Sequence, residues 1–150
     1  MKDHGGTEDR RSWMGILARA PEGRAAACLD AAMARPGFTW LRAPEIGTVM
    51  VRGRAGGTGA PFNLGETTLT RCALKLADGT VGHAYIQGRR KADAEVAALC
   101  DALMQTEDAA RIRRAVIEPL RTEADAARAS RARKAAATKV DFFTMVRGED

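Results

Sequence analysis

The expected fold rests on the stretch RCALKLADGTVGHAYIQ, residues 71–87. Two segments of β-forming residues, 71–77 and 80–87, flank Asp78-Gly79, a dipeptide that favours a tight β-hairpin turn. With a two-residue loop, the cross-strand pairs place six side chains on one face, which becomes the core face. The sheet is therefore expected to be antiparallel, with one buried and one polar face, and His83 is interpreted as a core histidine. The predicted pairs are Leu76 with Val81, Leu74 with His83 and Cys72 with Tyr85.

The residues before the hairpin predict a pair of helices. Thr7 can cap the first helix, and apolar side chains follow it at helical spacing. Pro21 suits the first turn of the second helix, which Pro36-Gly37 ends. Residues 1–6 have no apolar run and are expected to form a disordered leader. The apolar positions of the two helices are Trp13, Ile16, Leu17, Ala25, Cys28, Leu29, Ala32 and Met33.

Further strands and helices surround the hairpin. Segments 38–41 and 46–54 are rich in strand-forming residues and are separated by Pro44. After Gly88 the apolar residues recur with a helical period, so this helix is expected to cover the sheet. Its apolar stripe consists of Ala92, Val96, Leu99, Cys100 and Leu103.

A shorter helical segment and a long helix complete the chain. Pro119 is expected to break or kink the shorter segment, and the long helix is expected over 123–138. The predicted fold class is α+β: an antiparallel β-sheet meander with an N-terminal helix pair, a covering helix and an extended C-terminal helical arm. Residues 7–120 form the predicted α+β domain, and residues 121–150 form the arm.

The C-terminal arm joins a stem without large apolar side chains to an apolar end. From Arg121 to Lys139 there is no Leu, Ile, Val, Met or aromatic residue, although alanine favours a helix there. An apolar terminus on such a stem indicates docking on another subunit, and folding back onto its own domain is the alternative. The expected interface residues are Phe142, Phe143, Met145, Val146 and Arg147.

Composition restricts the class of protein. A formal net charge of +5 favours anionic partners such as nucleotides, phosphates, acidic proteins or nucleic acid. Three cysteines lie far apart without a Cys-x-x-Cys pair, which is typical of reduced thiols in a cytoplasmic protein. No signal peptide or membrane-spanning apolar stretch is visible.

One glycine-rich loop is the candidate binding site. In Gly53–Gly59, clustered glycines would let backbone amides approach an anion, and arginines can grip phosphate. The loop is neither a Walker loop nor a dinucleotide fingerprint, and a plain turn between strands is the alternative interpretation. The candidate phosphate-binding residues are Arg54, Gly56, Gly57, Thr58, Gly59 and Arg71.

The residues give little sign of an active site within this chain. There is no pair of histidines, no Cys/His constellation and no nucleophile elbow. Glu45, Glu66 and Glu95 are isolated carboxylates. We therefore expect no catalytic residue, no metal site and no resident cofactor.

Several short motifs occur in a distinctive order along most of the chain. They are Trp13-Met14, Gly56-Gly57-Thr58-Gly59, Gly65-Glu66-Thr67-Thr68-Leu69-Thr70-Arg71, Asp78-Gly79-Thr80-Val81-Gly82, Gln87-Gly88-Arg89 and the terminal segment 140–148. In order and spacing they resemble the G subunit of the bacterial carbon–phosphorus lyase core complex, the PhnG family. The resemblance runs from about Arg10 to Gly148.

The resemblance implies a role in phosphonate catabolism, in an assembly with the H, I and J subunits and more transiently with the K and L subunits. It implies that this chain is required, with the H, I and L subunits, to transfer an alkylphosphonate to C1 of the ATP ribose with release of adenine. ATP is then a substrate of the complex, and S-adenosylmethionine and an iron–sulfur cluster belong to a partner subunit. This chain would be a scaffold that contacts no nucleic acid or membrane.

Two alternatives are kept beside the scaffold interpretation. In one, the glycine-rich loop and Arg71 form part of a nucleotide or phosphonate site. In the other, the chain is a small basic nucleotide- or nucleic-acid-binding protein built on the helix at 128–139.

Overall fold

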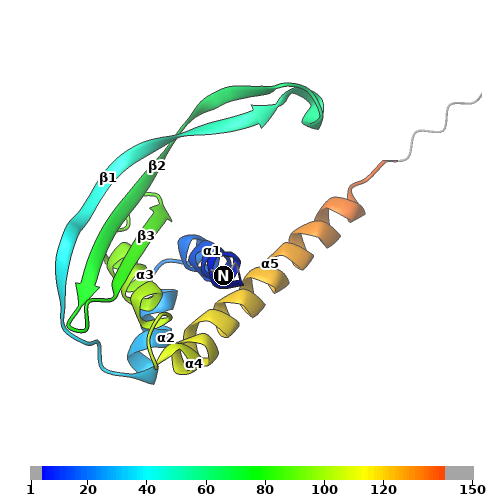
Figure 1. Ribbon diagram of the computed structural model, residues 1–150. Helices are drawn as coiled ribbons and strands as arrows, with labels where there is room; N and C mark the ends of the chain where they lie inside the picture. The colour runs from blue at the N-terminus through cyan, green and yellow to red at the C-terminus, as the bar shows by residue number, and fades with distance from the viewer. Residues whose placement is uncertain (1–4, 141–150) are drawn as a thin grey trace, which may run out of the picture.

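The computed structural model describes residues 5–140 and has an α+β fold, which confirms the predicted fold class. Three antiparallel strands form one sheet in the order β1-β2-β3, and helices pack against one of its faces (Figure 1). The elements are α1 (Gly5–Arg19), α2 (Arg24–Ala32), β1 (Phe38–Arg54), the short helical turn η1 (Ala55–Gly57), β2 (Pro61–Leu76), β3 (Val81–Gln87), α3 (Lys91–Leu103), α4 (Ala109–Ile112), the π-helical segment η2 (Arg113–Ile117) and α5 (Glu118–Ala137).

The hairpin at Asp78-Gly79 is present, but the predicted register is wrong by one residue. Lys75 pairs with Val81, and Leu74 pairs with Gly82. The turn contains three residues, because the amide of Leu76 donates to the carbonyl of Thr80 across the end of the loop. Gly79 has a φ of 90°, the left-handed conformation that closes a three-residue hairpin loop.

The shift of one residue reverses the two faces of β3. Gly82, Ala84 and Ile86 are buried, whereas Tyr85 is 55% exposed. His83 is exposed as well, so its interpretation as a core histidine is wrong. Because side chains alternate along a strand, a single extra loop residue moves the entire set to the other face.

The two strands before the hairpin are longer than predicted. β1 is continuous from Phe38 to Arg54, and the predicted break at Pro44 is instead a pair of register shifts between Trp40 and Glu45. Proline is tolerated there because β1 is an edge strand. β2 begins at Pro61, well before the predicted start at Arg71.

The core lies between the sheet and α3, as predicted. Leu74, Ile86, Val96 and Leu99 are almost completely inaccessible to solvent. Ala92 of the predicted stripe is exposed, and the shorter helices close the core from the side. At Gly82, β3 approaches α3 so closely that an added Cβ would collide with the backbone of Ala98 and Ala102.

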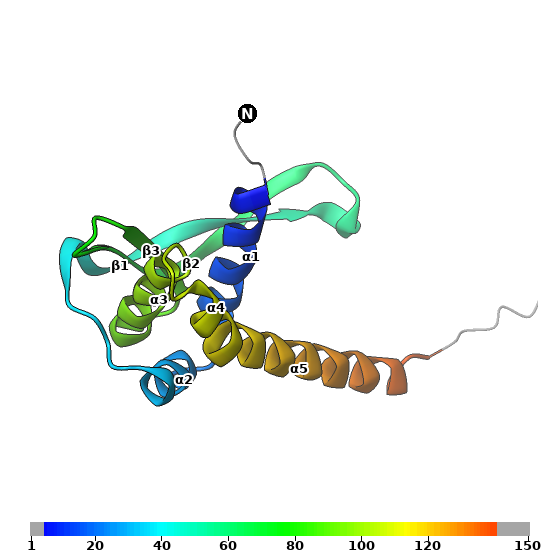
Figure 2. The ribbon, with the colours of Figure 1, turned by 60° about the horizontal axis from the view of Figure 1, so that its bottom comes forward.

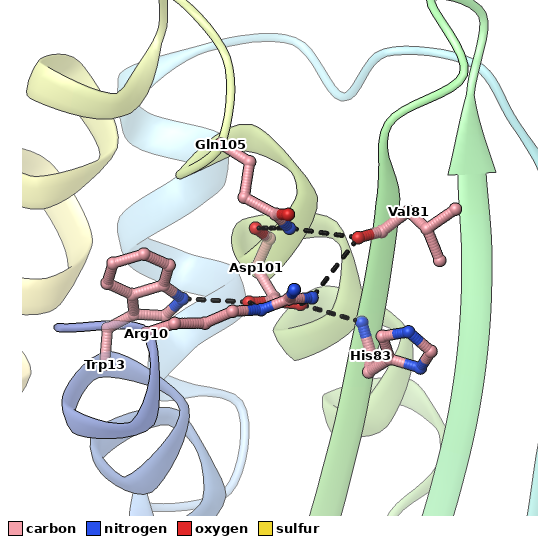
Figure 3. A network of polar contacts seen from close by, with 6 residues as sticks. All are labelled: Arg10, Trp13, Val81, His83, Asp101 and Gln105. Atoms are coloured by element: carbon pink, nitrogen blue, oxygen red, sulfur yellow. Dashed lines mark hydrogen bonds and ion pairs between the residues drawn. The ribbon is translucent and has the colours of Figure 1, made fainter. Parts of the chain in front are cut away.

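A buried carboxylate joins α1, β3 and α3 (Figure 3). The Asp101 side chain is fully buried and accepts hydrogen bonds from Arg10 (2.7 Å from Nη2), Trp13 (2.9 Å from Nε1) and the backbone amide of His83 (2.9 Å). The imidazole of His83 points away from Asp101 (Figure 3). The network satisfies polar groups along the outer edge of β3, which α1 partly covers.

The helix boundaries differ from the prediction at several points. α1 begins at Gly5, so Thr7 lies within the helix and is not its cap. α2 begins at Arg24, after Gly23 with a φ of 71°, and not at Pro21. Pro119 lies in the first turn of α5, directly after η2, so the helical path continues past it.

Candidate partner interface

The β1–β2 pair extends far beyond the third strand. β3 pairs with β2 only between Leu69 and Lys75, so the rest of the β1–β2 pair has no third strand. We call residues 46–54 of β1 and 61–68 of β2 the β-ribbon. The β-ribbon and α5 both extend from the body toward the same side (Figures 1 and 2).

Apolar side chains lie on both faces of the β-ribbon. Ile46 is paired with the buried Thr70, so Ile46 and Met50 continue the face that α3 covers further along. Val49 and Val51 alternate with them and point to the opposite face. Their exposed fractions are 41% for Ile46, 47% for Met50, 46% for Val49 and 37% for Val51.

The two edges of the β-ribbon carry backbone groups without a neighbouring strand. Thr68 and Leu76 direct their backbone groups toward β3, so even-numbered residues of β2 face that side. Glu66 has the same orientation, but it lies outside the stretch of β2 that pairs with β3. On β1, residues 46, 48 and 50 alternate with those that bond to β2 and therefore face the open edge.

Such a ribbon is unusual in a chain that acts alone. An isolated two-stranded hairpin is marginally stable in water, and exposed apolar strands with open edges favour pairing with another chain. Contiguous exposed apolar surface of this kind marks sites of protein–protein contact. The geometry therefore indicates a partner interface along the β-ribbon.

The glycine-rich loop forms the tip of the β-ribbon. Gly56 and Gly57 have φ values of 60° and 81°, which explains the need for glycine. The Arg54 guanidinium donates to the carbonyl of Gly59 (3.1 Å), and the Gly59 amide donates to the carbonyl of Ala55 (2.9 Å). Arg54 thus closes its own turn, beside an open hollow of about 520 Å³.

Arg71 is not part of this tip. It lies roughly 30 Å along β2 from Pro61, at about 3.3 Å per residue. There it donates to Glu45 (2.6 Å from Nε), which also pairs with Arg42. Hydrogen bonds from Arg42 and then Arg71 lower the pKa of the Glu45 carboxyl. The structure does not bring Arg54 and Arg71 together, and anion binding by the loop stays a prediction.

The predicted interface residues at the C-terminus, Phe142 to Arg147, lie outside the described residues. The structure shows instead exposed apolar residues on the β-ribbon, which the sequence analysis does not single out. A signal for them existed, because 46–51 and 61–69 alternate without a consistently polar face. The sequence analysis predicts a strand over 46–54 and assigns no element to 61–69.

Metal-binding and reactive groups are few among the described residues. Among residues 9–140, no group of three His, Cys, Asp or Glu side chains is placed to hold a metal ion. Burial raises the pKa of the Cys72 and Cys100 thiols to about 12, so both are protonated at neutral pH. Nor does any described helix combine the length and apolar character needed to cross a membrane.

Two comparisons with known proteins agree with each other. The model of the family described as phosphonate metabolism protein PhnG matches residues 8–148. The alpha-D-ribose 1-methylphosphonate 5-triphosphate synthase subunit PhnG of Rhizobium meliloti (strain 1021) is 45% identical over 148 residues, covering 99% of this chain and 95% of that protein. This chain therefore belongs to the PhnG family of phosphonate metabolism proteins.

Proposed function

We propose that this chain is a structural subunit of a phosphonate ribosyl-triphosphate synthase. Together with the H, I and L subunits, it would support transfer of an alkylphosphonate to C1 of the ATP ribose, with release of adenine. The name of the Rhizobium relative supports the reaction and the membership in a multi-subunit enzyme. The observation that carries the structural role is the β-ribbon, with its apolar faces and open edges.

The chemistry of the described residues supports a scaffold without an active site of its own. His83 is exposed, and its backbone amide, not its imidazole, bonds to Asp101. The Asp101 carboxylate accepts hydrogen bonds from three residues, and the Cys72 and Cys100 thiols are protonated. A nucleophile and a base within reach of one another are required for covalent catalysis.

The proposed assembly includes the H, I and J subunits in the cytoplasm, with the K and L subunits bound more transiently. ATP would be a substrate of that assembly, and S-adenosylmethionine and an iron–sulfur cluster would belong to the J subunit. The chain would reach its partners through the β-ribbon and through the segment after Lys139.

The test uses matched pairs of substitutions at exposed positions. Val49→Asp with Met50→Asp places two charges on the β-ribbon, one on each face. Ala27→Asp with Ala110→Asp places the same charges at exposed positions on α2 and α4. Each variant is co-expressed with the H, I and J subunits, and the amount of this chain recovered with a tagged I subunit is measured.

We expect the β-ribbon variant to lose at least nine-tenths of its recovery, because charged groups would have to be buried without partners. The control should be recovered like the unaltered chain, and thermal unfolding of each free variant checks that its body is folded. Equal recovery of both variants would contradict a role for the β-ribbon in assembly. If the unaltered chain is not recovered with any subunit, the scaffold proposal itself fails.

A further inference from the structure

A basic groove lies between α1 and the first half of α5. The two helices are in contact, and the Arg121 guanidinium donates to the Ser12 hydroxyl across them (3.3 Å). A hollow of about 470 Å³ opens beside this bond. We call this hollow the arginine groove; its charged residues are Arg11, Arg19, Arg121, Arg128 and Asp125.

Among the described residues, the positive charge of the arginine groove exceeds the negative charge that lines it. Four guanidinium groups and one carboxylate line it, which leaves three positive charges. Two nearby carboxylates are already engaged elsewhere, since Glu123 pairs with Arg24 (2.6 Å) and Asp9 pairs with Arg113 (2.7 Å). Within the described residues, none of the four groove arginines forms an ion pair.

Other arginines of the body, unlike the four in the groove, form ion pairs with carboxylates. Arg10, Arg35 and Arg90 each have a carboxylate partner within 4 Å. Guanidinium groups that share a hollow repel one another, so an unmatched set is unfavourable until an anion enters. The hollow itself has the volume of a small-ligand site.

The groove continues along α5. A second hollow of about 420 Å³ shares Arg19 and Arg128 with the first and adds Arg131. The α1 and α5 walls therefore present arginines to a continuous channel.

We propose that the arginine groove binds an oligophosphate, such as the triphosphate chain of a nucleotide or of a phosphorylated ribose. Arginine forms paired hydrogen bonds to phosphate oxygens, and its planar group suits this geometry. The arginines on each wall are separated by about 10–12 Å along the helix axis, from 1.5 Å per residue. A short phosphate chain brings several negative charges into that length, whereas carboxylates on a peptide are spaced more widely.

This assignment differs from the glycine-rich loop, which lies at the tip of the β-ribbon. The choice of a triphosphate among phosphate-bearing anions rests on the proposed function. Binding to the chain alone does not depend on assembly. A chain that binds tripolyphosphate but is not recovered with its partners would thus sink the scaffold proposal and leave the groove assignment standing.

The test is isothermal titration of the full chain with sodium tripolyphosphate at low ionic strength. The groove variant is Arg19→Gln with Arg128→Gln. The matched control is Arg89→Gln with Arg133→Gln, which removes the same charge at exposed positions outside the groove. Arg11→Gln provides a second groove variant at a side chain without a hydrogen bond among the described residues.

We expect saturable binding to the unaltered chain, a Kd at least tenfold higher for the groove variant, and a change below about twofold for the control. Absence of saturable binding to the unaltered chain would overturn the assignment. So would equal weakening in both double variants, since it would indicate attraction to net charge. Tighter binding of an oligoglutamate peptide or of duplex DNA than of tripolyphosphate would also overturn it, in favour of a macromolecular partner.

Discussion

Gly82 sets how closely the sheet and the covering helix approach. Its Cα faces the backbone of α3, where an added Cβ would collide with Ala98 and Ala102. Gly82→Ala should therefore lower the free energy of unfolding by about 1–3 kcal/mol, as overpacked cores do. Denaturant unfolding measures the change. Gly47→Ala is the control, because open space surrounds Gly47 in β1, and an equal loss in the two variants would contradict this account.

Asp101 is the polar centre of the body. Asp101→Ala would leave the Trp13 indole N–H and the His83 amide without their acceptor. Each buried donor left unsatisfied costs about 1–3 kcal/mol, so for these two donors we expect a loss of roughly 2–6 kcal/mol in denaturant unfolding. Asp30→Ala removes a carboxylate paired with Arg35 at the surface and should change stability little. Similar losses for both would show that burial of Asp101 is not decisive.

Two buried thiols should make the free energy of unfolding decrease at alkaline pH. Burial raises the pKa of Cys72 and Cys100 from 9.0 to about 12. Above pH 9 the unfolded chain therefore loses thiol protons that the folded chain retains, so the free energy of unfolding should fall as pH rises toward 12. Unfolding curves between pH 8 and 11 measure this slope. The double variant Cys72→Ala with Cys100→Ala should show a shallower slope, and an unchanged slope would exclude these thiols as its cause.

At the scale of elements, the β-ribbon and the body should be separable. Val49 pairs with Thr67, and their backbone groups face each other. Replacing residues 50–66 with Asn-Gly closes a short hairpin at this pair and removes most of the β-ribbon. The midpoint of thermal unfolding should shift by only a few degrees, because the core residues lie beyond this point. Unfolding of the shortened chain at room temperature would show that the β-ribbon supports the body.

The sequence predicted elements better than their register. Helical spacing identified α3 correctly, since most of its stripe is buried. The Asp78-Gly79 signal located the hairpin but not its loop length, and the extra residue reversed β3. A local dipeptide is compatible with two- and three-residue loops, and the packing of Gly82 against α3 selects between them. That contact is distant in sequence and cannot be read from the turn.

The site was harder to predict than the fold. The glycine-rich loop was recognised, but its alternative interpretation as a turn describes the observed geometry. The β-ribbon was missed because its exposed valines and methionine resemble core strand residues in sequence. Only the end of β3 at Gln87 reveals that no third strand covers them. The arginine groove likewise depends on the packing of α1 against α5, two elements about 100 residues apart.

At the scale of the whole molecule, the β-ribbon and α5 both project from a small body, toward the same side (Figure 1). α5 has one buried residue, Leu120, so most of its length contacts little of the body. The β-ribbon exposes apolar residues that a solitary protein would bury. Both features fit a chain that completes its packing within an assembly.

Hydrogen exchange of backbone amides tests the central claim most directly. The free chain and its complex with the H, I and J subunits are compared over residues 46–54 and 61–68, with α3 as an internal reference. Open edge amides should exchange quickly in the free chain and at least tenfold more slowly in the complex, while α3 changes little. Equal exchange of the β-ribbon in the free chain and the complex would contradict its assignment as the partner interface.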